Sequence, residues 1–153
     1  MNSNDDCRTY VEHMRTEHAH IDQALMELQN LLSQAAQSRE GDHSLLARLV
    51  KLRDDLRHHF RDEEEGGCLE EAQSKLPGLS EGVRKLQTEH ATFLSSLDAM
   101  ISKAEKLAGQ SATIRDLQSA FGDFLRRLHA HETEENRILL LGFGSPAMDT
   151  LST

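Results

Sequence analysis

The chain has 153 residues, 17 basic and 26 acidic side chains, and a formal net charge of −9. This length predicts a single domain over residues 1–153, with a core near 8–141 and a tail at 142–153. The acidic balance argues against nucleic-acid binding, because phosphate contacts need clustered basic side chains. Met1–Asp6 is too polar for a signal peptide, and the longest apolar run, Ile138–Leu141, is too short to span a membrane. We therefore expect a cytoplasmic protein with no membrane or nucleic-acid partner.

Strong helix formers dominate the composition, and only 4% of the residues are aromatic, which predicts helices around a leucine core. In chain order, we expect four helices, near 7–38, 43–74, 80–108 and 112–141. Asn4–Asp6 can cap the first helix, Gly41-Asp42 separates it from the second, and Gly66-Gly67 is expected to kink or fray the second. Pro77-Gly78 precedes the third helix, and Gly109–Thr113 precedes the fourth. The pattern predicts an all-α fold, an antiparallel up-down-up-down four-helix bundle.

The two halves of the chain match each other at an offset of 72 residues, without a gap. The dipeptide Glu17-His18 matches Glu89-His90 within a longer identical run. Three further pairs at the same offset are Leu56 and Leu128, His59 and His131, and Glu63 and Glu135. Such internal repetition predicts two helical hairpins related by duplication, which together make a bundle of four helices.

An apolar seam with alternating steps of three and four residues runs along each predicted helix. Six positions on this seam are polar: His18, His59, Glu63, His90, His131 and Glu135. Burying two carboxylates and four imidazoles without partners would destabilise a domain. Bound metal would neutralise and satisfy all six groups, so the sequence predicts that these six side chains form a metal site.

The spacing also places the six residues at one level of the bundle. In an antiparallel pair of helices, residues equidistant from the turn lie side by side, and the midpoint of each successive histidine pair falls at or beside a predicted turn. Within the second and fourth helices, histidine and glutamate are four residues apart. They therefore share a face with a rise of about 6 Å between them. Each such pair can reach two adjacent ions, which Glu63 and Glu135 can bridge.

The remaining histidines lie off the seam and are interpreted as surface residues: His13, His20, His43, His58 and His129. Of these, His20 and His129 could support the ligands from outside the metal site. Glu132, next to His131, is an alternative extra ligand, and Tyr10 is interpreted as a packing residue that could lie near the site. In the acidic run at 62–65, Glu63 alone is expected to face inward.

The two cysteines, Cys7 and Cys68, fit no metal-binding spacing and no disulfide framework. We expect two unpaired thiols, with a redox role for Cys68 as the alternative.

Mixed imidazole and carboxylate ligation suits iron, manganese or zinc. A structural zinc site is normally closed by four ligands, often thiolates, whereas six ligands from four helices indicate two ions with open positions. An oxo or hydroxo bridge and a small ligand such as dioxygen could fill those positions. Ferritin-like di-iron proteins use a Glu-x-x-His spacing of three, which the His-x-x-x-Glu spacing found here does not match.

At these residues the chain resembles the hemerythrin-like, or HHE cation-binding, family over about residues 8–141. That family carries a histidine on helices one and three and His-x-x-x-Glu on helices two and four. The matching residues are His18, His59 with Glu63, His90, and His131 with Glu135. The resemblance implies the bundle fold and two iron ions, possible substitutes being manganese and zinc. It also implies a small ligand such as dioxygen or nitric oxide.

Two positions depart from the oxygen-carrying hemerythrins. Those proteins have a second histidine four residues after the helix-three histidine, where this chain has Leu94. They have an aspartate five residues after the helix-four histidine, where this chain has Asn136. The four-histidine pattern is more similar to di-iron proteins that repair iron–sulfur clusters and to the iron- and oxygen-sensing domain of an F-box protein.

We therefore expect a metal-binding protein that binds or senses dioxygen, nitric oxide or iron, with no catalytic residue assigned. The alternative is a di-iron redox enzyme, either an oxidase, a peroxidase or an iron–sulfur repair protein. A third hypothesis is a partner-binding bundle that a metal stabilises.

Overall fold

The computed structural model describes residues 3–37, 43–107 and 111–144, in which all regular structure is helical. The elements are α1 (Ser3–Gln37), α2 (His43–Gly66), α3 (Cys68–Lys75), the 3₁₀ turn η1 (Pro77–Leu79), α4 (Ser80–Glu105) and α5 (Ser111–Phe143). The all-α prediction is confirmed. Among these described helices, none is long and apolar enough to cross a membrane.

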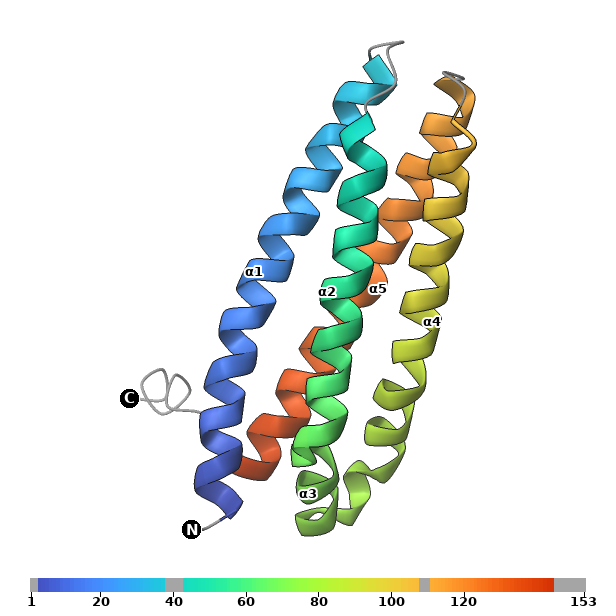
Figure 1. Ribbon diagram of the computed structural model, residues 1–153. Coiled ribbons are helices and arrows are strands. Elements are labelled where there is room, and N and C mark those ends of the chain that lie inside the picture. Colours follow the sequence, from blue (N-terminus) through green and yellow to red (C-terminus); the bar gives the residue numbers. More distant parts are fainter. Residues whose placement is uncertain (1–2, 38–42, 108–110, 145–153) are drawn as a thin grey trace, which may run out of the picture.

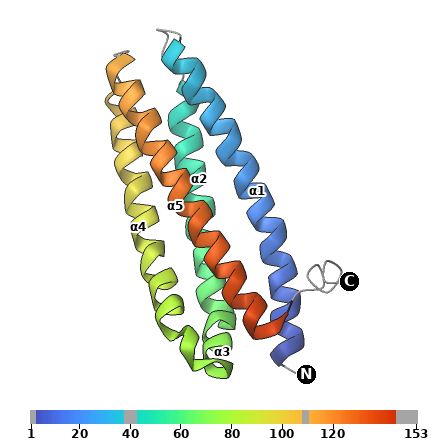
Figure 2. The same cartoon turned by 180° about the vertical axis from the view of Figure 1, so that it is seen from behind.

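The four long helices lie side by side, as Figures 1 and 2 show from opposite sides. Helix α1 contacts α2 and α5, and α4 contacts the same two helices. The colours of Figure 1 show that α1 and α4 run in one direction and that α2 and α5 run in the other. The short elements α3 and η1 make the turn from α2 to α4, at the end of the molecule where α1 begins. Each long helix thus turns a face toward a shared interior.

The second predicted helix, 43–74, is broken rather than kinked, and the two glycines have separate reasons to be there. Gly67 adopts a positive φ of 67°, a conformation that side chains rarely take, and this ends α2 and starts α3. Gly66 makes room for Tyr10, because a Cβ atom added at Gly66 would lie 2.8 Å from the Tyr10 ring. The break lets the chain reach Pro77 by a short separate helix.

The outer helix boundaries also differ from the prediction. Helix α1 begins at Ser3, so Asn4–Asp6 lie within it and do not cap it. Helix α5 continues to Phe143, whose side chain is buried, so the predicted tail at 142 starts too early. The predicted turn at Gly41-Asp42 lies outside the described residues, and the turn at Pro77-Gly78 is confirmed.

Two apolar clusters fill the described interior. The larger cluster is rich in leucine and phenylalanine from α1, α2, α4 and α5, such as Leu25, Leu49, Leu97 and Phe121. The smaller cluster surrounds α3 and the last turns of α5, and it includes Cys68, Ala72, Leu86, Ile138 and Phe143. On each of the four long helices, the predicted metal-site residues fall in the sequence between members of the two clusters or beside them. The apolar packing therefore brackets a polar layer.

Cys7 on α1 and Cys68 at the start of α3 form a disulfide, and none of the described cysteines is free. The expectation of two unpaired thiols is therefore wrong. The pairing could not be deduced from the sequence, because 61 residues separate the two cysteines and the fold alone brings their Cα atoms to 5.7 Å. Disulfides persist mainly in oxidising compartments, so this pair runs against the expectation of a cytoplasmic protein.

We expect the free energy of unfolding of the Cys68→Ser variant to be about 3–4 kcal/mol lower than that of the oxidised wild type. The reason is that the disulfide closes a long loop and restricts the unfolded chain. Urea unfolding with and without a reductant measures the difference. A reductant should lower the stability of the wild type and leave the variant unchanged; equal midpoints for the reduced and oxidised wild type would contradict the prediction.

Candidate metal centre

The structure brings together every residue that the sequence assigned to the metal site. All six side chains are buried, His18 being the most exposed of them at 8%. Their ligand atoms form two overlapping groups, within each of which the atoms lie no more than 4.8 Å apart. The first group is His18, His59, Glu63 and Glu135, and the second is Glu63, His90, His131 and Glu135. The two glutamates are common to both groups.

Each shared glutamate directs its two oxygens toward different groups. Glu63 Oε1 lies 2.7 Å from His59 Nε2, and Glu63 Oε2 lies 2.9 Å from His90 Nε2. Glu135 Oε1 lies 3.7 Å from His18 Nε2, and Glu135 Oε2 lies 3.5 Å from His131 Nε2. Each carboxylate therefore spans the space between the two histidine pairs, which is the geometry of a bridging ligand.

Most of these atoms are buried without a hydrogen-bond partner. The orphaned atoms are both oxygens of Glu63, both oxygens of Glu135, and Nε2 of His90 and of His131. Leaving one such group unsatisfied in a protein interior costs about 1–3 kcal/mol. With metal–ligand bonds of about 2.1 Å, neighbouring ligand atoms around one ion lie about 3 Å apart, which is close to the separations observed. The donor set fits a metal ion in each group.

Burial and the two carboxylates govern the protonation of the site. Burial lowers the pKa of His59, but the negative charge of Glu63, whose Oε1 lies 2.7 Å from His59 Nε2, and the contact with Glu17 outweigh it and raise that pKa to about 9. Burial also opposes ionisation of Glu63, yet its imidazole neighbours hold the pKa of that carboxyl well below its usual range. Burial raises the pKa of Glu135. A metal ion entering the site must therefore displace protons from imidazole.

This protonation gives the metal-free protein a pH dependence of defined sign. The pKa of His59 is about 9 in the folded chain, against an ordinary 6.5. Protonation of His59 therefore contributes its full stabilisation of the fold below about pH 6.5, and this contribution is lost as the pH rises to 9. We expect a loss of up to about 3 kcal/mol over that range, measured by urea unfolding of the metal-free protein. Metal binding should tighten over the same range. A metal-free stability that does not change from pH 6.5 to 9 would contradict this protonation state.

Three further carboxylates orient the histidine rings from behind. His59 Nδ1 lies 2.7 Å from Glu17, and His131 Nδ1 lies 3.2 Å from Glu89, two contacts that the 72-residue repeat relates. His90 Nδ1 lies 3.0 Å from Glu64. Contacts of this kind hold the ring so that Nε2 faces the metal.

None of these three carboxylates was predicted from the sequence, although the matching Glu17-His18 and Glu89-His90 pairs were a signal for two of them. His20 and His129 were expected in the supporting role instead. His129 lies at the surface with Nε2 3.6 Å from Asp22, and His20 lines a pocket between α1 and α2. Neither is among the groups found beside the histidine Nδ1 atoms in the described structure.

We expect Glu89→Gln to weaken metal binding by about 10–100-fold, because His131 then loses the carboxylate that orients its ring. A competition titration with a chelator measures the change. Glu65→Gln is the matched control, since Glu65 is an exposed glutamate two residues after Glu63 on α2. Equal affinities for Glu89→Gln and the wild type would show that the contact has no such role.

The aromatic surroundings make the two ligand groups unequal. The Phe60 ring stacks on His90 with centroids 4.1 Å apart, and Phe93 meets His131 edge-on at 5.1 Å. The residue at the repeat-related position of Phe60 is Glu132, which is buried and whose pKa burial raises to about 7. Glu132 belongs to neither ligand group within the described structure. The group with His90 and His131 therefore packs against an aromatic ring, whereas the group with His18 and His59 lies near the buried carboxyl of Glu132.

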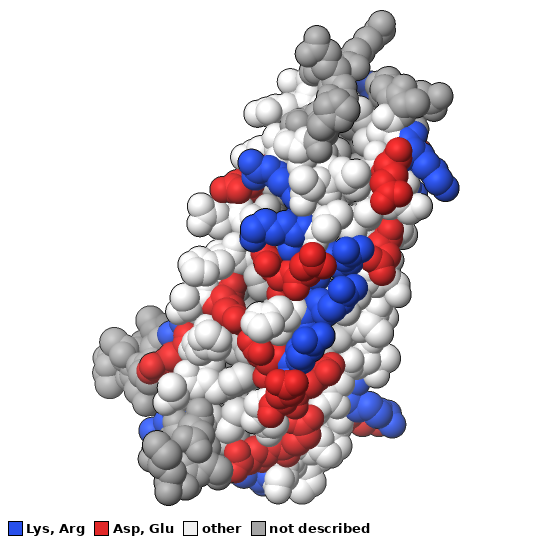
Figure 3. All heavy atoms as spheres, viewed as in Figure 1, with Lys and Arg blue, Asp and Glu red and all other residues white. Residues whose placement is uncertain are grey.

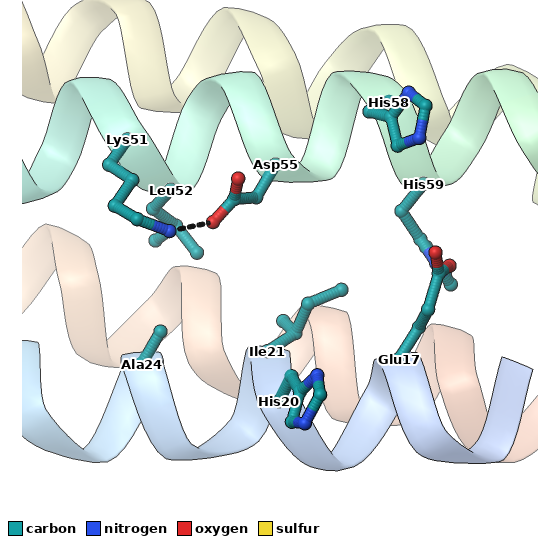
Figure 4. Close-up of a pocket in the computed structure, with 9 residues that line it drawn as sticks. All are labelled: Glu17, His20, Ile21, Ala24, Lys51, Leu52, Asp55, His58 and His59. Carbon is teal, nitrogen blue, oxygen red and sulfur yellow. Dashed lines mark hydrogen bonds and ion pairs between the residues drawn. The ribbon is translucent and has the colours of Figure 1, made fainter.

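A pocket of about 350 Å³ lies between α1 and α2, on the outer side of His59 (Figure 4). His58 lies at its rim and is 69% exposed, with Nε2 3.4 Å from Asp62. His59, one residue further, faces the interior, as the predicted seam requires. Figure 4 also shows Glu17 extending from α1 toward His59 across this pocket.

No protein-family model, no curated protein and no solved structure matches this chain. The interpretation of the centre therefore depends on the geometry and chemistry of its own residues.

Proposed function

We propose that the chain is a hemerythrin-like, non-haem di-iron protein that binds or senses dioxygen, nitric oxide or iron. The observation that carries this proposal is the pair of overlapping buried ligand groups joined by Glu63 and Glu135. Two groups that share both carboxylates suit two neighbouring ions better than one.

The donor set supports iron, with manganese and zinc as possible substitutes. Imidazole and carboxylate donors without thiolate are typical of iron and manganese sites, and zinc can also occupy them. Because both glutamates are shared, each group offers four protein ligands, which would close a tetrahedral zinc site but leave positions open for a small molecule on a six-coordinate iron ion. Two iron ions would supply a change of oxidation state and open positions for dioxygen or nitric oxide.

The order of the ligands along the chain supports the hemerythrin-like, up-down-up-down arrangement. The helices α1 and α4 each provide one histidine, and α2 and α5 each provide a histidine and a glutamate four residues later. The four long helices contact one another in the order α1, α2, α4, α5 and back to α1. This neighbour order is the one that an antiparallel bundle of two hairpins requires.

In this proposal the protein residues have distinct tasks. His18 and His59 would bind one ion, and His90 and His131 would bind the other. Glu63 and Glu135 would contribute to both positions. Glu17, Glu64 and Glu89 orient the rings. Phe60 and Phe93 pack against the histidines and exclude water from one side of the centre.

The optical spectrum of the iron(II)-loaded protein tests the function, recorded before oxygen, after oxygen and after degassing. A charge-transfer band that appears and then reverses supports oxygen binding. A band that appears and persists supports a sensor that responds by oxidation. Rapid catalytic consumption of added hydrogen peroxide would favour the enzyme alternative, and the absence of any iron-dependent band would contradict the proposal.

A further inference from the structure

A third group of side chains that could hold a metal ion lies on the outer face of α1 and α2. His13, Glu17 and Asp62, here called the outer cluster, offer ligand atoms that all lie within 4.8 Å of one another. His13 Nε2 lies 3.3 Å from Glu17 Oε1, and the His13 side chain is 59% exposed. His58 adds another imidazole, with Nε2 3.4 Å from Asp62. The outer cluster is thus open to solvent, unlike the buried centre.

Glu17 connects the outer cluster to the buried centre. Its Oε1 faces His13, while its Oε2 lies 2.7 Å from Nδ1 of the ligand His59. Glu17 also lines the pocket between α1 and α2, together with His20, Asp55 and His58 (Figure 4). One carboxylate therefore touches both an exposed imidazole and a ring of the buried centre.

The internal repeat provides a comparison for this cluster. The position related to His13 is Lys85, and the position related to His58 is Ala130. The position related to Asp62 is Glu134, which is ion-paired with Arg137 on the same helix. The second half keeps the contact between Glu89 and His131 without any outer imidazole. Orienting the inner histidine therefore does not require an outer imidazole.

The charge around the outer cluster favours a cation. Figure 3 shows acidic side chains gathered over the lower half of α2 in the view of Figure 1. The run Asp62 to Glu65 contributes to this face, whereas the second half has Arg137 at the position related to Glu65. A surface of one sign raises the local concentration of counter-ions and the rate at which they bind.

We propose that His13, Glu17 and Asp62 form a separate site for one divalent transition-metal ion, through which metal is delivered to the buried centre. One imidazole and two carboxylates suit iron(II), manganese(II), cobalt(II) or zinc(II), with water completing the coordination at an exposed site. The ion binds more weakly there than in the buried centre, because fewer protein ligands hold it and solvent screens it. The delivery role rests on the proposed dinuclear centre, whereas the existence of the outer site does not.

Cobalt(II) is the probe for the test, with the number of bound ions measured by equilibrium dialysis and the rate of loading by stopped-flow absorbance. We expect three ions per wild-type chain. The His13→Ala/Asp62→Ala variant should bind two and load them at least about tenfold more slowly. The repeat-related control, Lys85→Ala/Glu134→Ala, should behave like the wild type. An unchanged count and rate in the first variant, or an equal slowing in the control, would overturn the proposal.

A second variant separates this proposal from the dinuclear one. Glu63→Ala/Glu135→Ala lacks both shared carboxylates but keeps the outer cluster, so it should retain one cobalt ion, with circular dichroism confirming its helical fold. Retention of that ion supports the outer site even where the buried centre fails to bind. If the variant binds none while the wild type binds two, the outer site does not exist and the dinuclear centre stands.

Discussion

Replacing Glu63 with alanine should reduce the iron that the chain retains after desalting, which removes the weaker ion of the outer cluster, from two ions to at most one. The two oxygens of Glu63 face His59 in one ligand group and His90 in the other, so the substitution removes a ligand from both positions. The affinity for any remaining ion should fall by more than about 100-fold, since losing even a supporting residue costs 10–100-fold. Elemental analysis after anaerobic loading with iron(II) measures the count.

The control for this prediction lies in the same acidic run. Glu65→Ala removes a glutamate two residues further along α2, where the side chain is exposed, and should leave two ions bound. Glu135→Ala should reproduce the loss seen with Glu63→Ala, because the repeat relates the two residues. Two ions in either ligand variant would refute the bridging role of that glutamate.

Removing the metal should lower the melting temperature by about 10 °C. Metal that binds only the folded chain stabilises it by about 4 kcal/mol when free metal exceeds the dissociation constant a thousandfold. For a domain of this size, each kcal/mol changes the melting temperature by about 2–4 °C. The metal stabilises the fold because it binds the buried oxygens and nitrogens of the site, which have no hydrogen-bond partner in the metal-free chain.

Circular dichroism of iron(II)-loaded and chelator-treated protein, both kept anaerobic, provides this measurement. The variant Glu63→Ala/Glu135→Ala should show little response to metal, because it lacks the two shared ligands. An equal response in the wild type and the variant would place the stabilising ion elsewhere. A wild type that melts at one temperature in both states would show that the six side chains bind no metal.

The helical fold was predictable because the seam is long and regular. Apolar residues recur at steps of three and four along each long helix, and one leucine of this seam from each helix is buried as predicted: Leu25, Leu49, Leu97 and Leu128. The convergence of the six polar residues was predictable for a related reason. They occupy seam positions at equal distances from the turns, so the packing of the leucines brings them to one layer.

Features that depend on contacts between distant residues were not predictable. The disulfide joins Cys7 to Cys68, which directly follows the break at Gly67 and whose Cα atom lies 5.7 Å from that of Cys7. Phe60 follows a ligand histidine and lies off the seam, yet its ring is buried against His90. Glu64 was interpreted as part of a solvated face and its side chain is 54% exposed, but its Oε1 also lies 3.0 Å from His90 Nδ1, which was not predicted.

The most direct test of the dinuclear centre is the combined iron count and electron paramagnetic resonance spectrum of the oxidised, iron-loaded wild type, desalted to remove the weaker ion of the outer cluster. Two iron(III) ions that share Glu63 and Glu135 should couple antiferromagnetically, so we predict two ions per chain and no signal at low temperature. A single ion per chain with the signal of isolated high-spin iron(III), or two ions that both give that signal, would contradict a carboxylate-bridged pair.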